Sequence, residues 1–349
     1  MGLPQIHRNG APRLKSLHNL EAMETVCFLQ DDQDSVKVKN NPSFYISILQ
    51  RWNCPLKTML IHGYFIQNGF CLSIVSLWTT LVDMYARCGS LEGAYAVFER
   101  LAKENIVMWN TLIIRYCDYG FSKQALELFY EMQCEGIKPQ RVTFIGALKA
   151  CTNILAYDNG RKIHVDIVES GLEWGTYIGN ALINMYGKCG NLTDAKCVFE
   201  RLPNQNTVAW NSLMTVFVQY GACEEALQIF QKMQIQFEPD KVTFICVIKA
   251  CLQIAALQYG KVVHTLVVDS IFASDISVNN TLIDMYVNCG SFHDAQCVFH
   301  KMSNPNVVTW STLIAGYADH GQAEEALELF EKMHEDGIQP NEVTFVGIL

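Results

Sequence analysis

Residues 84–90, Met-Tyr-Ala-Arg-Cys-Gly-Ser, decide the fold, because nearly the same seven residues return twice further along the chain. The later copies are MYGKCGN at 185–191 and MYVNCGS at 285–291, so successive copies start 101 and 100 residues apart. Self-similarity at a fixed period is the sequence signature of repeat architectures. The sequence therefore predicts an array of repeated units.

Two further phrases recur with the same period. One is VTFI at 142–145, which returns at 242–245 and, as VTFV, at 343–346; the other is a tryptophan pair, Trp109-Asn110, Trp210-Asn211 and Trp310-Ser311. A period near 100 residues is too long for one supersecondary unit, and it divides into three units of about 31, 35 and 35 residues.

Each unit has the pattern of two helices. In the unit 106–140, one apolar stripe has the i, i+3, i+4, i+7 spacing of a helix face, and residues 125–132 form a second stripe. The first stripe consists of Trp109, Leu112, Ile113 and Tyr116. Gly120 separates the two helices, Gly136 stands where a left-handed residue ends a helix, and Pro139 follows as a stop.

A single hairpin of this kind cannot bury its apolar stripe, whereas stacked neighbours can. The predicted fold class is all-α, a right-handed superhelical solenoid of helix-turn-helix repeats with the first helices on its concave face. The expected organisation is an N-terminal extension, a degenerate long unit, eight full units and a truncated long unit. Their ranges are 1–39, 40–74, 75–105, 106–140, 141–175, 176–206, 207–240, 241–275, 276–306, 307–341 and 342–349.

Composition excludes several classes of protein. Half of the 349 residues are hydrophobic and 17% are charged, which excludes disorder as the main state. No apolar stretch reaches the ~18–20 residues of a membrane span, so no membrane partner is expected. The net charge of −9 means that any nucleic-acid binding has to rest on local geometry.

Histidine and cysteine give no sign of a cofactor or metal site. The 14 cysteines of a chain without a secretory signal are expected to be reduced, and no two have the Cys-x-x-Cys spacing of a compact zinc site. The repeated cysteines are better explained as small, buried helix-packing residues: Cys88, Cys189, Cys289, Cys151, Cys251, Cys197 and Cys297. His164 and His264 recur a full period apart, and the tryptophans fit core packing.

Two families have helical units of this length. The tetratricopeptide pattern fits the Trp, Leu, aromatic, Ala, Phe and Pro positions but expects a glycine in the first helix, where Ile113, Met214 and Ile314 stand. Tetratricopeptide arrays also lack a fixed triplet of unequal units. A protein-binding scaffold of that type is kept as the alternative.

Other phrases carry a closer resemblance. VVTWSTLIAGY at 307–317 with GIQPN at 337–341, VTFIGALKAC at 142–151 with GRKIH at 160–164, and GNALINMYGKCG at 179–190 look like three motifs of one family. The chain resembles a plant pentatricopeptide repeat protein of the subclass that alternates standard (P), long (L) and short (S) motifs. The resemblance extends over roughly 300 residues, which contain the three successive triplets of repeated units.

The resemblance implies binding of single-stranded RNA, with one base per unit contacted by the fifth and last residues. The base-reading pairs it implies are Thr79 with Asn105 and Ser311 with Asn341 for adenine, Asn110 with Gln140, Asn180 with Asn206 and Asn280 with Asn306 for a pyrimidine, and Asn211 with Asp240 for uracil. Gln140 departs from the usual Asp or Asn. Ile145 and Ile245 at the fifth position of L units cannot hydrogen-bond a base, so these units act as spacers.

The second residue of each P unit is expected to wedge against base faces, and these residues are Val107, Val208 and Val308. Phosphate contacts are expected from Arg87, Lys188, Lys149 and Lys249. Asn and Asp at a helix start are also common caps, which remains an alternative role for the pairs.

No enzyme activity is expected from these residues. Zinc deaminase chemistry, which the subclass associates with C-to-U editing of organellar transcripts, needs a His-x-Glu and a Cys-x-x-Cys motif, and neither occurs. The expected role is an RNA-recognition factor in a mitochondrion or chloroplast, with an editing deaminase or editing-complex protein acting in trans and no small-molecule substrate. An editing enzyme whose catalytic domain lies beyond Leu349 remains a third hypothesis.

Overall fold

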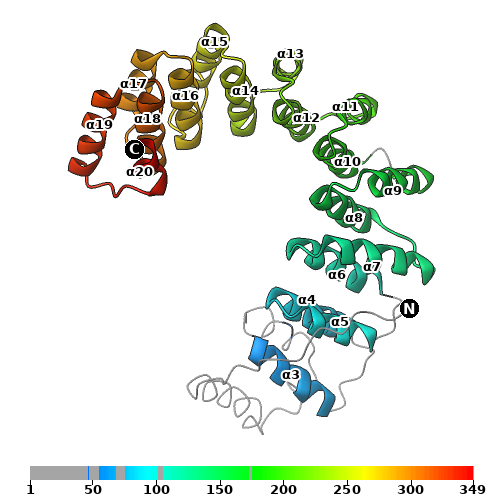
Figure 1. Ribbon diagram of the computed structural model, residues 1–349. Coiled ribbons are helices and arrows are strands. Elements are labelled where there is room, and N and C mark those ends of the chain that lie inside the picture. Colours follow the sequence, from blue (N-terminus) through cyan, green and yellow to red (C-terminus); the bar gives the residue numbers. More distant parts are fainter. Residues whose placement is uncertain (1–45, 47–54, 68–74, 101–104, 173–174, 349) are drawn as a thin grey trace, which may run out of the picture. The chain divides into compact units, whose positions relative to one another are not determined.

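The computed structural model describes residues 46, 55–67, 75–100, 105–172 and 175–348 of the chain. Over these ranges all regular secondary structure is helical, in helices α3 to α20 (Figure 1). The all-α class predicted from the sequence is confirmed. The predicted extension 1–39 and most of the degenerate unit 40–74 lie outside the described residues.

The chain divides into two compact parts, an N-terminal part of residues 1–154 and a C-terminal part of residues 155–349. The described helices of the N-terminal part are α3 (Pro55–Gln67), α4 (Val75–Arg87), α5 (Leu91–Glu99), α6 (Ile106–Asp118), α7 (Ser122–Cys134) and α8 (Arg141–Ile154). Here α4, α6 and α8 are first helices of the repeated hairpins, and each packs against the next.

The C-terminal part continues the same arrangement. Its helices are α9 (Tyr157–Glu169), α10 (Thr176–Lys188), α11 (Leu192–Arg201), α12 (Thr207–Gln219), α13 (Cys223–Met233), α14 (Lys241–Gln253), α15 (Leu257–Val268), α16 (Ile276–Asn288), α17 (Phe292–Lys301), α18 (Val307–Asp319), α19 (Ala323–Glu335) and α20 (Glu342–Ile348). Even-numbered helices are the first helices; each contacts the next one, and from α10 to α18 each contacts its own second helix. No described helix combines the length and the apolar character that crossing a membrane requires.

Glycine ends the helices at the predicted places. Gly120 and Gly136 have φ of +83° and +77°, in the left-handed region that residues with a Cβ avoid. The following N–H groups then turn back onto the helix, Phe121 N donating to the Tyr116 carbonyl at 2.8 Å. This hydrogen bond satisfies one of the free carbonyls at the helix end.

The tryptophan stripe forms the core between hairpins. Trp109, Trp210 and Trp310 are 0%, 7% and 3% exposed, as core packing predicts. Each ring meets a phenylalanine of the preceding hairpin edge-on, the Phe98, Phe199 and Phe299 centroids lying 4.6, 4.6 and 4.7 Å away. An aromatic pair of this geometry adds about 0.5–1.5 kcal/mol to the gain from burial.

The cysteines follow the prediction only in part. Cys151 and Cys251 are fully buried, and Cys88, Cys189 and Cys289 are partly buried. The expectation of burial is wrong for Cys197 and Cys297, which are exposed on α11 and α17. Both residues lie on second helices, on the side that faces solvent.

A small residue meets a large one where α10 packs on α12 and where α16 packs on α18. A Cβ placed on Gly187 would lie 2.1 Å from Val216 Cγ2, and one on Gly316 would lie 1.9 Å from Val287 Cγ1. Val287 is the repeat equivalent of Gly187, and Gly316 that of Val216. The two junctions thus use the same complementary pair in opposite order.

Histidine and tyrosine pair where an L-type second helix meets the next first helix. The Nδ1–Oη distance is 3.0 Å for His62 and Tyr85, and 2.8 Å for both His164 with Tyr186 and His264 with Tyr286. Burial raises the pKa of Tyr286 to about 12, so its hydroxyl stays protonated beside the imidazole. Burial, with Lys301 nearby, lowers the pKa of His264, against a smaller opposite effect of Asp294. These histidines therefore have a structural role.

We expect Gly187→Ala to lower the free energy of unfolding by about 1–3 kcal/mol, because the new methyl overlaps the stiff Val216 side chain. Helix propensity alone would give the opposite sign, a gain of about 1 kcal/mol. Urea denaturation followed by circular dichroism measures the difference. The exchange Gly187→Val with Val216→Gly reproduces the order seen at Val287 and Gly316, and it should recover most of the loss. An unchanged or raised stability of Gly187→Ala would contradict the overlap.

Stability should fall as the pH drops below about 6.5, the ordinary pKa of histidine. The unfolded chain then takes up protons that the lowered pKa values of His62 and His264 deny to the folded chain. His264→Asn should weaken this fall, because its Oδ1 accepts from Tyr286 but does not titrate. Urea midpoints between pH 7.5 and 5 test this, with the exposed His300→Asn as control. Equal slopes for His264→Asn and the wild type would rule out the coupling.

Candidate nucleic-acid interface

Consecutive first helices bring the fifth residue of a unit next to the last residue of that unit. Asp240 is the N-cap of α14, where its Oδ1 accepts from Thr243 N at 2.9 Å. Asn211 on α12 reaches it, with Nδ2 donating to Asp240 Oδ1 at 2.9 Å and to Oδ2 at 3.1 Å. The unit 207–240 therefore keeps this pair together, although it is one residue shorter than the unit 106–140.

Two other pairs line a cavity together with a valine. Thr79 and Asn105 share a cavity of about 820 Å³ with Val107, and Arg87 also lines it. Ser311 and Asn341 share one of about 220 Å³ with Val308, and Ser311 Oγ lies 3.3 Å from Asn341 Oδ1. In both places the structure brings the predicted polar pair and the predicted wedge residue to one hollow.

Two pairs that have an asparagine at the fifth position are joined through a threonine. Gln140 N donates to Thr143 Oγ1 at 3.0 Å, and Thr143 Oγ1 donates to Asn110 Oδ1 at 2.6 Å. The same chain runs from Asn306 N to Thr309 Oγ1 at 3.2 Å and on to Asn280 Oδ1 at 2.7 Å. In these units the fifth residue contacts the start of the next helix rather than the side chain of the last residue.

The pair Asn180 and Asn206 differs from the others. Asn206 caps α12, its Oδ1 accepting from Ala209 N at 2.9 Å. Asn180 Oδ1 is buried and has no hydrogen-bond partner among the described residues. Ala209 stands where the other three junctions with a fifth-position asparagine have threonine, so no hydroxyl is available to Asn180.

Capping, the alternative role for the last residues, is observed. Asn105, Asn206, Asp240, Asn306 and Asn341 each accept a hydrogen bond from a backbone N–H in the first turn of the next helix, at 2.8, 2.9, 2.9, 3.0 and 3.0 Å. One carboxylate or amide oxygen can accept more than one hydrogen bond. Capping therefore fixes where these side chains lie without consuming all their capacity.

The wedge valines are open to solvent. Val107, Val208 and Val308 are 53%, 55% and 50% exposed, although each belongs to a helix with a buried face. Val142, Val242 and Val343 hold the same position in L units and are equally exposed, at 48%, 53% and 59%. These three valines were not predicted as wedge residues from the sequence, although each begins a repeated VTFI or VTFV phrase.

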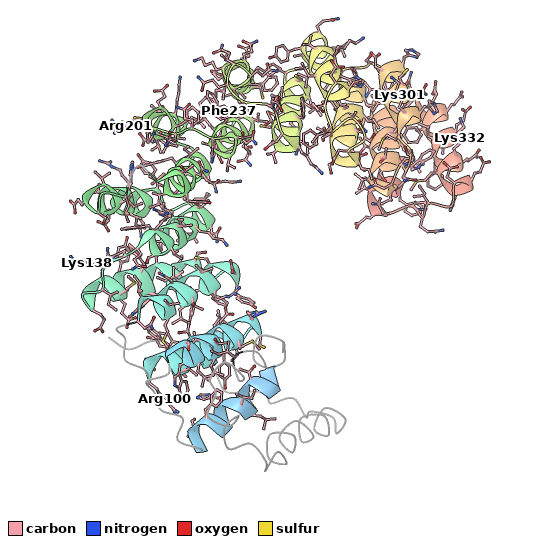
Figure 2. All side chains as sticks on the ribbon, turned by 180° about the vertical axis from the view of Figure 1, so that it is seen from behind. Arg100, Lys138, Arg201, Phe237, Lys301 and Lys332 are labelled. Atoms are coloured by element: carbon pink, nitrogen blue, oxygen red, sulfur yellow. The ribbon has the colours of Figure 1, made fainter. Side chains whose placement is uncertain are left out.

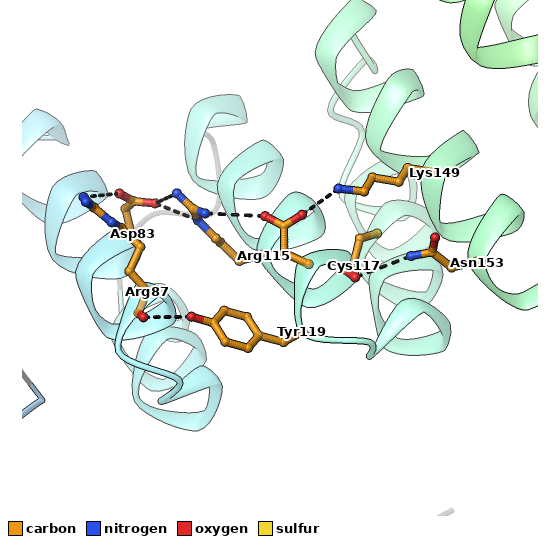
Figure 3. Close-up of polar contacts among 8 residues, drawn as sticks. Asp83, Arg87, Arg115, Cys117, Tyr119, Lys149 and Asn153 are labelled. Carbon is orange, nitrogen blue, oxygen red and sulfur yellow. Dashed lines mark hydrogen bonds and ion pairs between the residues drawn. The ribbon is translucent and has the colours of Figure 1, made fainter. Parts of the chain in front are cut away.

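Two of the four predicted phosphate contacts are engaged in ion pairs within the N-terminal part. Figure 3 shows a row in which Arg115 lies between Asp83 and Asp118, at 2.8 Å from Asp83 Oδ1 and 3.4 Å from Asp118 Oδ2. Lys149 Nζ lies 2.6 Å from Asp118 Oδ1, and Arg87 Nη1 lies 3.6 Å from Asp83 Oδ2. The two carboxylates, which offset the charge of these basic side chains, were not predicted from the sequence.

The other two predicted contacts, Lys188 and Lys249, are exposed and have no ion pair within the described ranges. Lys188 ends α10, where its carbonyl accepts from Tyr220 Oη at 2.7 Å. Many other basic residues lie on second helices or just after them, as Figure 2 shows for Arg201, Lys301 and Lys332. The first helices thus carry little uncompensated positive charge.

Within the described residues, no three His, Cys, Asp or Glu side chains are close enough together to hold a metal ion. The repeated polar groups described above lie at the junctions between first helices. The threonines Thr143, Thr243, Thr309 and Thr344 belong to them and were not singled out from the sequence. The sequence feature that marks these threonines is a Val-Thr dipeptide at the start of a first helix. By itself this dipeptide cannot be distinguished from an ordinary helix start.

Comparison with known proteins identifies the repeat. A family model described as the PPR repeat family matches residues 104–153, 205–253 and 305–349, and one described as the PPR repeat matches residues 76–106, 180–206 and 280–306. Among solved structures, the chain resembles the pentatricopeptide repeat protein PPR10 crystallised with an 18-nt psaJ RNA element. The TM-score is 0.71 at 20% identity, covering 88% of this chain and 47% of that one.

Curated relatives agree with this assignment. A chloroplastic pentatricopeptide repeat-containing protein of Arabidopsis thaliana is 39% identical over 83% of this chain, and a second one from the same plant is 37% identical over 83%. A mitochondrial one is 35% identical, also over 83%. The chain spans 36%, 40% and 34% of the lengths of these relatives. With its repeats matched in every triplet, the chain belongs to the plant pentatricopeptide repeat family.

Proposed function

We propose that this chain binds single-stranded RNA in a sequence-specific manner, with one base at each junction between a P or S unit and the next unit. The observation that carries the proposal is the repeated pairing of a polar fifth residue with a capping residue beside an exposed valine. Such a group offers hydrogen bonds to a base edge and an apolar surface to its face. The RNA complex of PPR10, a maize protein of the same fold, supports this proposal.

The proposed base preferences follow the pairs. Thr79 with Asn105 and Ser311 with Asn341 select adenine, Asn211 with Asp240 selects uracil, and the three remaining pairs select a pyrimidine, weakly at Asn110 with Gln140. The L units, with Ile145 and Ile245 at the fifth position, act as spacers. The proposed footprint from 5′ to 3′ is A, weak pyrimidine, any, pyrimidine, U, any, pyrimidine, A.

The finer assignment is to the P-L-S subclass and to organellar RNA processing. The alternation of short, P and long units supports the subclass. Relatives whose names place them in the chloroplast or the mitochondrion support an organellar location. We propose that the described repeats are a recognition module for C-to-U editing, and that another domain or protein supplies the deaminase.

Exchanging the residues of one pair should change one base of the footprint. The double variant Asn211→Ser, Asp240→Asn gives this junction the pair of the adenine junction, and the preference at its nucleotide should shift from U to A. Each good base contact contributes about 1–3 kcal/mol of discrimination, so the shift should be at least fivefold. Selection from a random single-stranded RNA pool, with sequencing of the bound fraction, measures it.

The reciprocal variant Ser311→Asn, Asn341→Asp is the matched control. It should change an A to a U at the nucleotide of the last full unit and leave the others unchanged. If the wild type enriches no sequence, or if both variants keep the wild-type pattern, the base-reading role is wrong. A binding surface for proteins would then be the better explanation of a chain with net charge −9.

Removing the charge of Asp118 should strengthen RNA binding at low salt. Lys149, 2.6 Å from this carboxylate, would then be free to neutralise a phosphate. For a single strand, each such contact steepens the dependence of log K on log salt by about 0.7. Fluorescence anisotropy of Asp118→Asn from 50 to 300 mM salt measures the slope.

Two controls belong to this measurement. Glu331→Gln changes the net charge equally but lies exposed on a second helix, so its salt slope should equal that of the wild type. Lys149→Gln should have little effect alone and should cancel the gain in the Asp118→Asn background. A gain that survives this second change would mean that Lys149 is not the group released.

A further inference from the structure

Four junctions share a threonine that accepts the same backbone hydrogen bond. Thr143, Thr243, Thr309 and Thr344 each accept from the backbone N–H of the preceding capping residue, at 3.0, 3.1, 3.2 and 3.1 Å. A hydroxyl has one proton to donate. Because the backbone N–H occupies an acceptor site of the oxygen, that proton is left for a neighbouring oxygen.

In three of the four junctions, the nearest such oxygen belongs to a fifth-position asparagine; Asp240 Oδ1 and Asn306 Oδ1, at 3.0 and 3.1 Å, are second acceptors for Thr243 and Thr309. Thr143 Oγ1 lies 2.6 Å from Asn110 Oδ1, Thr243 Oγ1 lies 2.7 Å from Asn211 Oδ1, and Thr309 Oγ1 lies 2.7 Å from Asn280 Oδ1. An amide nitrogen with two protons is a poor acceptor, so the hydroxyl selects one of the two amide orientations. The oxygen points to the threonine and the NH2 group is directed away from it; at Asn211 that group also donates to the two Asp240 oxygens, at 2.9 and 3.1 Å.

All four threonines are fully buried, and two of them contact a fifth-position asparagine that is itself buried. Thr143 and Thr243 are 0% exposed, and their partners Asn110 and Asn211 are only 9% and 6% exposed. A hydrogen bond shielded from water is costly to break, because water does not reach the buried donor and acceptor to replace the lost partner. The amide orientation is thus held by the helix that follows, not by the helix that carries the asparagine.

Among the four junctions with a fifth-position asparagine, one lacks this hydroxyl. Ala209, fully buried, occupies the threonine position after Asn180, and Asn180 Oδ1 is the fifth-position oxygen left without a partner in the described residues. Turning that amide over costs no hydrogen bond to a threonine. Asn180 can therefore present either its oxygen or its NH2 group to a ligand.

We propose that the threonine at the third position of a unit is a positioning residue for base recognition by the preceding unit. It fixes the fifth-position asparagine as a hydrogen-bond donor, which suits the acceptor groups of a pyrimidine, and Ala209 makes the Asn180 junction less selective. The inference rests on the proposed function and adds to it a third residue that acts through the fifth. It also places one determinant of each base preference in the following unit.

Removal of one hydroxyl tests the inference. Thr243→Val keeps the shape of the side chain and loses the proton, whereas Thr243→Ser keeps the proton. We expect Thr243→Val to reduce the preference at the nucleotide of Asn211 about fivefold, the ratio that corresponds to one neutral hydrogen bond, and Thr243→Ser to retain it. Preferences at all other nucleotides should stay as in the wild type. A purely structural role of Thr243, such as capping α14, would weaken binding to every sequence equally.

Addition of a hydroxyl provides the second arm, which does not depend on the folding of Thr243→Val. Ala209→Ser should raise the preference at the nucleotide of Asn180 about fivefold, because the new hydroxyl can donate to the free Oδ1. Ala209→Val, which adds bulk without a donor, is the matched control and should not raise it. Binding of all variants is measured with the same RNA set, in which one nucleotide at a time is changed.

The outcomes separate the two proposals. If the wild type shows no base preference at any nucleotide, the proposed function fails and the positioning role fails with it. If the wild type shows preferences that remain unchanged in both Thr243→Val and Ala209→Ser, the proposed function stands and the positioning role is overturned. A change confined to the nucleotide of the altered junction in either arm supports the positioning role.

Discussion

The in-phase stacking of the first helices is the constraint on which the rest of the structure depends. A single hairpin leaves its apolar stripe open, so each stripe is completed by the neighbouring hairpin, as when Phe199 meets the edge of Trp210. The same register sets where the next helix begins relative to the fifth residue of the previous one. Hydrophobic packing and the polar pair of Asn211 and Asp240 are thus two results of one alignment. A rotation of either helix by one residue would separate both, because side chains on a helix turn by about 100° per residue.

Sequence periodicity predicted the helices well because it reports what each hairpin must bury. The spacing of Trp109, Leu112 and Ile113 predicted a buried face, and Gly120 and Gly136 predicted the helix ends. The polar pairs could be proposed because a family resemblance supplied their positions. The threonine contacts could not, since a threonine in the first turn of a helix is common for reasons of capping alone. The ion pairs of Asp118 were also missed, because its partner Arg115 is replaced by Val216 and Gly316 at the equivalent positions and periodicity carries no information there.

In the proposed function, the selectivity of an acidic chain would come from the junctions and not from a basic surface. The basic side chains Arg115 and Lys149 are held by carboxylates on the same face, so they contribute little long-range attraction. What remains at a junction such as that of Asn211 and Asp240 is short-range: a capping carboxylate, a fifth residue held by hydrogen bonds, and a solvent-exposed valine such as Val208. Interactions of this kind distinguish between ligands of similar charge, because they depend on the placement of donors and acceptors over a few ångströms.

The opposite order of glycine and valine at two junctions limits how such an array can be rearranged. A recombination that joined the unit 276–306 to the unit 207–240 would set Val287 against Val216, two branched side chains where the structure has room for one. The converse fusion, 176–206 to 307–341, would set Gly187 against Gly316 and leave a gap. Units that look alike in sequence are therefore not interchangeable parts. When units of this chain are duplicated, deleted or exchanged, the two matched units on either side of a junction therefore have to be kept together.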